Sequence, residues 1–144
     1  MKIVVAIDGE DSAKSALDEI AAQKYSSETQ IHLVHVIVPG FADVSTPGIP
    51  DTVAIERDEE KGVLEQMAKD LKAKLNIDAT AEILEGEVAQ AIAGACKKYG
   101  ADEAIVPSRA RHGFSRLWFG SVADEIVDAA PCTVVVQKMS ESKA

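Results

Sequence analysis

Apolar residues in this chain gather in five short runs that are typical of β-strands. The runs span residues 2–8, 30–38, 78–84, 102–107 and 132–137. All but the third are nearly continuous in apolar side chains, as expected of parallel strands that are covered on both faces. The pattern therefore predicts a sheet that lies in the interior of the molecule.

Four segments between the runs repeat apolar residues every three or four positions, which predicts amphipathic helices. Their apolar positions extend from Ala13 to Ala21, Leu64 to Leu75, Val88 to Tyr99 and Val122 to Ala130. Asp11 or Ser12 is expected to cap the first helix through its side-chain oxygen, and Gly100 is placed to end the third. Strands and helices alternate, so the predicted fold class is α/β: a three-layer α/β/α arrangement around a parallel sheet.

The remaining segments are polar or rich in proline. Residues 39–50 hold three of the five prolines and are expected to form a loop. Residues 57–62, with the sequence RDEEKG, are expected to be exposed to solvent near the start of the second helix. Residues 139–144 are expected to form a disordered tail, which leaves residues 1–138 as a single domain.

Composition and charge restrict the classes of function. The chain has 24 acidic and 15 basic residues, a net charge of −9, which argues against binding to nucleic acid or to anionic membranes. No apolar run is long enough to span a membrane, and the N-terminal run is too short for a secretory signal, so a cytoplasmic location is expected. Cys96 and Cys132 lack the spacing of metal ligands, and we expect reduced thiols that serve in packing.

Residue patterns that indicate catalysis or a metal site are missing. Ser12, Ser108 and Ser115 have no evident histidine and aspartate partners. His32 and His35 are three positions apart on a predicted strand, so they point to opposite faces and do not share a metal ion. We therefore expect no catalytic residues and no metal site built from histidines.

The carboxyl ends of the predicted strands are the natural place for a ligand, at the point where the strand order reverses. One such end is Asp8-Gly9. Another opens residues 106–122, VPSRARHGFSRLWFGSV, which contain three arginines and lead into a predicted helix. Peptide N–H groups at a helix start favour anions such as phosphate. Arg109, Arg111 and Arg116 could bind phosphate, pair with the many carboxylates of this chain, or recognise an acidic partner.

These segments carry a resemblance to a known family. IVVAIDGEDSAKSAL, HLVHV and the stretch from EGEVAQAIAGACKKYG to APCTVVV resemble the universal stress proteins along nearly the whole chain. The resemblance implies an adenine nucleotide alpha-hydrolase-like, Rossmann-like fold. Its five parallel strands would follow the order 3-2-1-4-5, which puts the reversal beside Asp8.

One branch of that family binds ATP through a loop of the pattern Gly-x2-Gly-x9-Gly-Ser/Thr. On this chain the three glycine positions fall at Pro107, Ala110 and Gly120, with Ser121 as the hydroxyl, so two of the glycines are replaced. If the first glycine donates its N–H, Pro107 removes a contact; if that position only ends a strand, proline costs little. If the second glycine has a positive φ, Ala110 costs about 1–2 kcal/mol, and otherwise almost nothing.

The resemblance implies an adenine nucleotide, ATP or AMP, as the ligand, with weaker affinity if the two replacements matter. Asp8 would contact the ribose, or a Mg²⁺ ion that arrives with the nucleotide; its structural alternative is to cap the Gly9 turn. The nucleotide-binding residues that the resemblance implies are Ala6, Ile7, Asp8, Val36, Pro107, Ser108, Arg109, Ala110, Arg111, Gly113, Gly120, Ser121 and Val122. Core packing is the alternative for the side chain of Val36.

The last strand, Cys132 to Gln137, would lie at an edge of the sheet, and an exposed apolar edge favours pairing with a second copy. The resemblance therefore implies a homodimer through this strand. The leading hypothesis is a cytoplasmic, dimeric regulator of the stress response that binds a nucleotide and hydrolyses ATP slowly at most. The alternative is a universal stress protein that binds no nucleotide and acts on an unknown protein partner.

Overall fold

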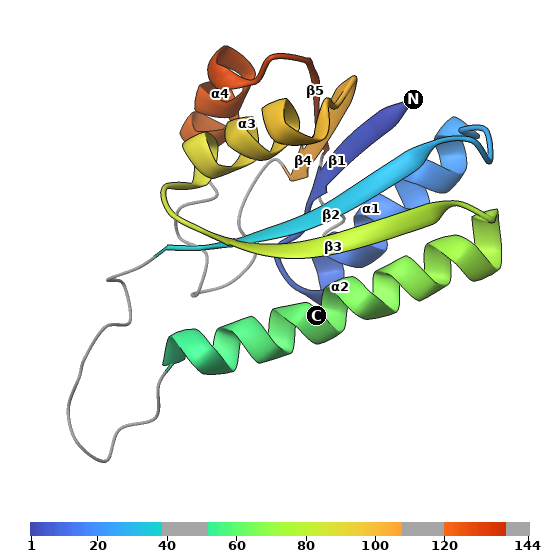
Figure 1. The fold of residues 1–144 in the computed structure, drawn as a ribbon, viewed down its shortest axis with the longest axis horizontal. Coiled ribbons are helices and arrows are strands. Elements are labelled where there is room, and N and C mark those ends of the chain that lie inside the picture. The colour runs from blue at the N-terminus through green and yellow to red at the C-terminus, as the bar shows by residue number, and fades with distance from the viewer. Residues whose placement is uncertain (39–51, 108–119, 138–144) are drawn as a thin grey trace.

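The computed structural model describes residues 1–38, 52–107 and 120–137. The predicted loop at 39–50 and the predicted tail at 139–144 lie outside the described residues. The strands and helices that the structure describes alternate as predicted (Figure 1). In chain order they are β1 (Lys2–Ala6), α1 (Glu10–Gln23), β2 (Gln30–Ile37), α2 (Thr52–Leu75), β3 (Asp78–Glu85), α3 (Val88–Tyr99), β4 (Glu103–Pro107), α4 (Gly120–Ala129) and β5 (Thr133–Gln137).

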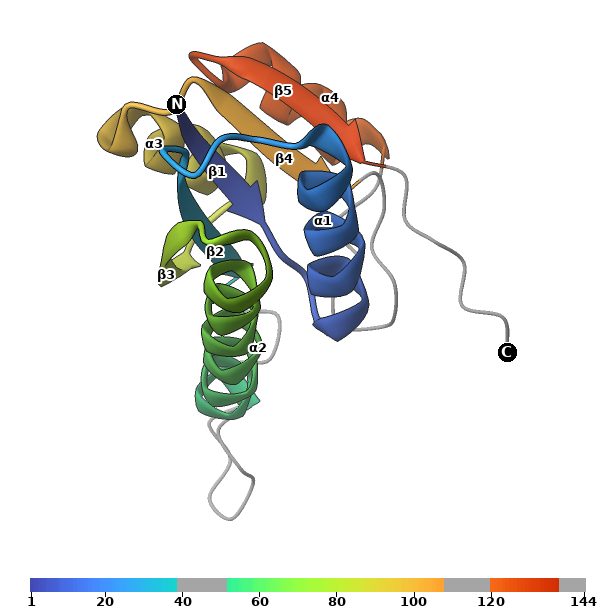
Figure 2. The ribbon, with the colours of Figure 1, turned by 90° about the vertical axis from the view of Figure 1, so that its right-hand side faces the viewer.

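The five strands form one parallel sheet in the order β3-β2-β1-β4-β5, as the resemblance implied. Helices α1 and α2 cover one face of the sheet, and α3 and α4 cover the other (Figure 2). The three-layer α/β/α architecture is therefore confirmed. Strand β1 lies at the centre, and the strand order reverses between β1 and β4.

Strand β1 shows why the apolar runs are continuous. Ile3 and Val5 pack into the core beneath α1 and α2, whereas Val4 and Ala6 pack into the core beneath α3 and α4. All four are at most 2% exposed. A strand with helices on both faces has no side that tolerates polar residues, because each face must bury apolar surface.

Two helix ends test the expected caps. Gly100 ends α3 in the left-handed conformation, with φ 72°, as predicted. The expected cap of α1 by Asp11 or Ser12 is wrong, because the helix starts earlier: Gly9 occupies the cap position and Glu10 is the first helical residue. Gly9 has φ 92°, a conformation that L-residues rarely adopt, so the backbone itself turns the chain into the helix.

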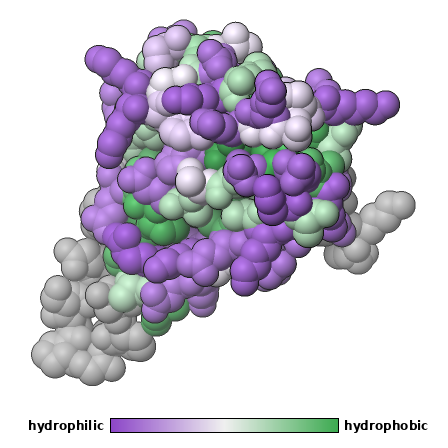
Figure 3. Space-filling model, turned by 45° about the vertical axis from the view of Figure 1, so that its right-hand side comes forward, coloured by the Kyte–Doolittle hydropathy of each residue, from purple (hydrophilic) through white to green (hydrophobic). Residues whose placement is uncertain are grey.

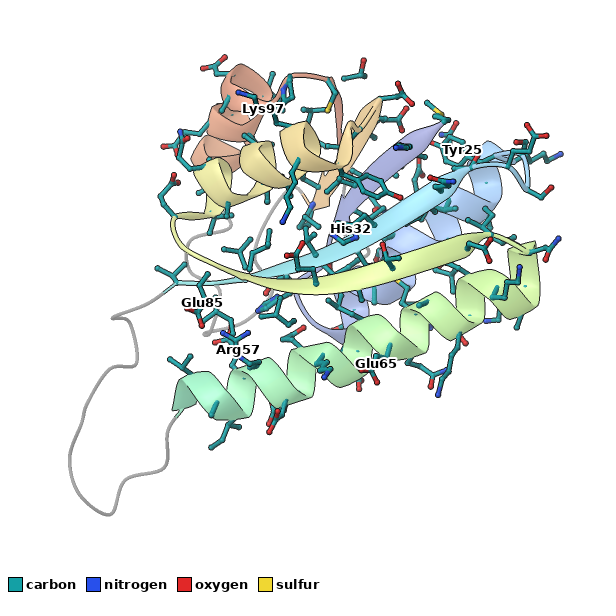
Figure 4. All side chains as sticks on the ribbon, in the orientation of Figure 1. Tyr25, His32, Arg57, Glu65, Glu85 and Lys97 are labelled. Atoms are coloured by element: carbon teal, nitrogen blue, oxygen red, sulfur yellow. The ribbon has the colours of Figure 1, made fainter. Side chains whose placement is uncertain are left out.

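Two glutamates, one at the end of β3 and one just after it, have structural partners that their sequence positions did not reveal. Glu87 caps α3 by accepting the N–H groups of Ala89 and Gln90, each at 3.1 Å. Glu85 pairs with Arg57 of α2, and Figure 4 shows the two side chains pointing toward one another. The pair joins the end of β3 to the first turns of α2.

The cysteines are free thiols, in agreement with their expected role in packing. Cys96 is fully buried in the core between the sheet and α3, and Cys132 packs against the same core. Burial, with the neighbouring Cys132 second, raises the pKa of Cys96 to about 12. A thiol with so high a pKa is a poor nucleophile at neutral pH.

Polar and apolar side chains share the one face of the surface that Figure 3 draws. Figure 3 shows one face on which hydrophilic residues cover most of the area and smaller hydrophobic areas lie between them. Among the helices that the structure describes, none is long and apolar enough to cross a membrane.

The buried core should determine stability. Leu33 on β2 is fully buried between β2 and the helices α1 and α2. We expect Leu33→Ala to lower the free energy of unfolding in urea by about 2–5 kcal/mol, because the truncation leaves a cavity. Val127→Ala on α4 is the control, since Val127 is 48% exposed, and should change that free energy by about 0.5 kcal/mol or less. Equal losses in the two variants would contradict this account of the core.

Candidate functional site at the carboxyl edge of the sheet

The carboxyl ends of β1, β2 and β4 lie side by side, because these strands pair in register. Ala6 of β1 lies opposite Val34 of β2, and Val5 lies opposite Ile105 of β4. The ladder continues past the strand, since the N–H of Ile7 donates to the carbonyl of Val34 at 2.8 Å. The chain next to Ile7 therefore leaves the sheet at the same level as the last residues of β2 and β4.

The residues that the resemblance assigned to a nucleotide fall into three groups. Ala6, Ile7 and Val36 are buried strand-end residues, at most 3% exposed. Asp8 is partly exposed just beyond β1, Pro107 is buried as the last residue of β4, and Val122 is half-buried in the first turn of α4. Ser108, Arg109, Ala110, Arg111 and Gly113 lie outside the described residues, and Gly120 and Ser121 are placed only as the start of α4.

Helix α4 begins at the same edge of the sheet. It carries the chain back from the end of β4 to the start of β5, and the two strands are parallel. A helix that makes this crossover must start at the carboxyl edge and run toward the amino edge. The peptide N–H groups of the first turn, which have no acceptor within a helix, therefore lie at the carboxyl edge of the sheet, as Asp8 does.

A polar cluster that sequence reasoning missed stands beneath this edge. His35 of β2 is 2% exposed. Its Nδ1 lies 2.9 Å from the carbonyl oxygen of Ile7, and its Nε2 lies 2.8 Å from a carboxylate oxygen of Glu56. Glu60, one turn further along α2, has an oxygen 3.7 Å from Nδ1. We call His35, Glu56 and Glu60 the edge cluster.

The proton positions in the edge cluster follow from its partners. A carbonyl oxygen only accepts hydrogen bonds, so Nδ1 of His35 carries a proton and donates it to Ile7. When Glu56 is ionised, Nε2 also donates, and the ring is then a cation. Burial alone would lower the pKa of His35. The hydrogen bond to Glu56 and the negative charge of Glu60 outweigh burial, with smaller help from the Ile7 carbonyl and Asp8, so the pKa is raised above its ordinary value.

Glu60 corrects the expectation that residues 57–62 are simply exposed to solvent. Its side chain is 16% exposed, and the nearby backbone of Gly9 lowers its pKa. Burial raises the pKa of Glu60, against the opposing effect of the His35 charge. One carboxylate oxygen is buried without a hydrogen-bond partner among the described residues. Two sequence signals could have found the cluster: a histidine inside an apolar strand, and two glutamates four residues apart on one helical face.

His32 confirms that the two histidines of β2 face opposite sides. Its ring stacks on Tyr99 of α3, with centroids 4.9 Å apart, and bonds Thr80 and Glu82 of β3 at 2.6 and 3.0 Å. Figure 4 shows His32 on the side of the sheet that faces α3. Within residues 1–38, 52–107 and 120–137, no group of three or more His, Cys, Asp or Glu could hold a metal ion.

The edge cluster makes stability depend on pH. Because the pKa of His35 is higher in the folded protein, its stabilising effect is complete below about pH 6.5 and is lost as the pH rises through the folded-state value. We expect the free energy of unfolding in urea to fall as the pH rises from about 6 to about 9.

Two variants of α2 isolate this effect. Glu56→Gln removes the interaction that contributes most to raising the pKa of His35, so the fall with pH should shrink. Glu65→Gln, an equal charge change at an exposed site of the same helix, should retain it. An identical pH dependence in the two variants would overturn this account.

Comparison with known proteins identifies the family. Residues 1–138 match the model of the universal stress protein family. The chain is also similar to the universal stress protein YxiE of Bacillus subtilis, with 30% identity over 146 aligned positions that cover 94% of this chain and 97% of the relative.

Solved structures share the fold. The structure of a hypothetical protein, MJ0577, matches with a TM-score of 0.81 and 23% identity over 98% of this chain and 97% of that one. A universal stress family protein of Arabidopsis thaliana with AMP bound matches with a TM-score of 0.65 and 20% identity over 99% and 94%. A universal stress protein of Archaeoglobus fulgidus in complex with dAMP matches with a TM-score of 0.62 and 21% identity over 97% and 98%. Together with the sheet order, the family match shows that this chain belongs to the universal stress protein family.

Proposed function

We propose that this universal stress protein is a cytoplasmic, dimeric regulator whose single domain, residues 1–138, binds an adenine nucleotide at the carboxyl edge of its sheet. It would act through binding rather than catalysis. The observation that carries the proposal is the convergence of three strand ends and one helix start at the point where the strand order reverses. Ligands of doubly wound sheets bind at such a point.

The chemistry of this edge fits an adenine nucleotide. Near the ends of β1 and β2, the buried residues Ala6 and Val36 would present their backbone to an adenine ring. Asp8 offers a carboxylate for ribose hydroxyls, or for a Mg²⁺ ion that accompanies the phosphates. The start of α4 offers peptide N–H groups for phosphate oxygens. The AMP and dAMP that accompany the Arabidopsis and Archaeoglobus proteins support an adenine nucleotide as the class of ligand.

The position of Pro107 supports retained binding. Pro107 is the last residue of β4 and lies opposite Gln137 of β5. Among the described residues, the pairing of β4 with β1 ends earlier, at Ile105. A proline at a strand end gives up little backbone hydrogen bonding. Ala110 lies outside the described residues. Direct measurement of nucleotide binding therefore decides between this function and a protein-interaction module that binds no nucleotide.

Nucleotide binding should be measured first on the purified protein. We expect denaturation to release AMP or ATP, and calorimetric titration to give saturable binding. Asp8→Asn should weaken the affinity by about tenfold or more, because the carboxylate loses its charge-assisted contacts. Asp18→Asn is the matched control, since it removes one acidic charge from an exposed site of α1. Absence of binding at about 1 mM of either nucleotide would reject the proposal and favour the interaction module.

The dimer is supported by the state of β5. This strand is an edge of the sheet, and its Val136 is 43% exposed. Unpaired backbone groups beside an exposed apolar side chain invite pairing with a second strand. Two copies of β5 paired about a twofold axis would cover both the edge backbone groups and the Val136 side chain. The two free cysteines are in keeping with a reducing compartment such as the cytoplasm.

Light scattering after size exclusion tests the dimer. We expect twice the monomer mass for the wild type and the monomer mass for Val136→Lys, because a charge at the strand edge opposes pairing. Ala81→Lys places the same charge at an exposed position of β3, the opposite edge, and should remain dimeric. A monomeric wild type, or a dimer that survives Val136→Lys and dissociates with Ala81→Lys, would reject pairing through β5.

A further inference from the structure

The turn that presents Asp8 is held from beneath by side chains of β2 and α2. Strand β1 ends at Ala6, and among the described residues the ladder extends to Ile7, whose N–H donates to Val34. The chain then passes through Asp8 to Gly9, where φ is 92° and the backbone turns into α1. Two peptide groups, the carbonyl of Ile7 and the N–H of Gly9, flank Asp8 on either side.

Each of these peptide groups has a side-chain partner in the edge cluster. Nδ1 of His35 donates to the carbonyl of Ile7 at 2.9 Å. The backbone of Gly9 lowers the pKa of Glu60, which places the carboxylate beside the N–H of Gly9, and Oε1 of Glu60 lies 4.0 Å from the point where a Cβ on Gly9 would stand. His35 of β2 therefore contacts the turn just before Asp8, and Glu60 of α2 contacts it just after Asp8.

The members of the edge cluster also hold one another. Nε2 of His35 bonds Glu56 at 2.8 Å, and Nδ1 lies 3.7 Å from Glu60. His35 is 2% exposed and the Glu60 side chain 16%, so water has little access to replace a lost bond. A buried donor or acceptor that loses its partner is costly, and the backbone shifts to satisfy it.

We infer that His35 is a positioning residue for the nucleotide site: its Nδ1 bond to the Ile7 carbonyl, together with the Glu60 carboxylate beside Gly9, sets the direction in which Asp8 points. This inference rests on the proposed nucleotide site. It adds a role for residues of β2 and α2 that lie behind the turn. In metal sites, the loss of a bond that supports a ligating side chain typically costs about 10- to 100-fold in affinity or activity, and we expect a loss of similar size here.

Two amide variants separate the Nδ1 bond from mere filling of space. The side-chain amide of Asn can stand where Nδ1 of histidine stands, so His35→Asn retains a donor for Ile7 and gives up Glu56. The longer Gln reaches the position of Nε2, so His35→Gln retains Glu56 and gives up Ile7. Both variants remove the ring and its charge.

We expect His35→Gln to weaken AMP binding, measured by calorimetry, by about tenfold or more. His35→Asn should stay within about threefold of the wild type, even where its melting temperature is the lower of the two. His32→Gln, on the opposite face of the same strand, should bind as the wild type does. Equal losses in the two His35 variants, or a greater loss in His35→Asn, would overturn the inference.

The ligand-free protein provides a second readout that does not depend on nucleotide binding. In His35→Asn, the Gly9 amide should keep its wild-type NMR chemical shift and its protection from hydrogen exchange. In His35→Gln, its chemical shift should change and its protection should be lost. If wild-type protein binds no AMP, the proposed function fails, while this comparison still decides whether His35 sets the turn. Unchanged Gly9 signals in both variants would reject the positioning role.

A second pair of variants applies if the His35 variants do not fold. Glu60→Gln retains an oxygen for a hydrogen bond with the N–H of Gly9, and Glu60→Ala removes it. AMP affinity should be retained within about threefold in the first variant and fall by about tenfold or more in the second. Equal affinity in the two would show that the turn does not depend on this bond and would overturn the inference.

Discussion

Strand β1 is hydrogen-bonded to β2 along one side and to β4 along the other, and its side chains are buried on both faces. A shift of register by one residue would move Ile3 and Val5 to the wrong core and break both ladders at once. The end of β1 is therefore a fixed point in the molecule. The Asp8 turn, the start of α1 and the neighbouring ends of β2 and β4 all take their positions from it.

Hydrophobic packing fixes the sheet but does not orient a turn, because burial of apolar surface has no directional preference. Direction at the carboxyl edge comes from hydrogen bonds, and the protein places a buried histidine there among carboxylates. Taking these charges out of water is unfavourable unless they satisfy one another. Their arrangement around His35 meets that condition in part, since one oxygen of Glu60 has no hydrogen-bond partner among the described residues. The cost is consistent with a region that serves geometry more than stability.

Much of the fold could be predicted from the sequence, and the reasons are local. Near-continuous apolar runs marked the strands, and Gly100 marked the end of α3 because only a left-handed residue fits there. The start of α1 was missed because a cap by backbone conformation at Gly9 leaves no side-chain signal. Glu60 was misjudged because its burial depends on β2 and the β1–α1 turn, which are distant in sequence and close only in the fold.

The candidate site divides in the same way. Asp8, Val36 and Pro107 could be placed at strand ends from their positions after apolar runs, and the structure puts them at one edge. His35 was considered only as a metal ligand, because its real partners are a main-chain carbonyl and two helical glutamates. Sequence patterns report which face a residue occupies, but they do not report which backbone atom it meets there.

The first residues of the chain have a practical consequence of their own. The backbone N–H of Lys2 donates to the Asp102 side chain at 2.9 Å, and the carbonyl of Met1 accepts from the N–H of Gln30 at 2.9 Å. The hydrogen bonds that hold β1 in place therefore begin at Met1. Anything joined ahead of Met1 leaves from the amino edge of the sheet. Five residues of extended β1 span about 16 Å and separate that edge from the Asp8 turn. An affinity tag or fluorescent reporter attached there would stand on the far side of the sheet from the turn, which makes this end the natural place for labelling.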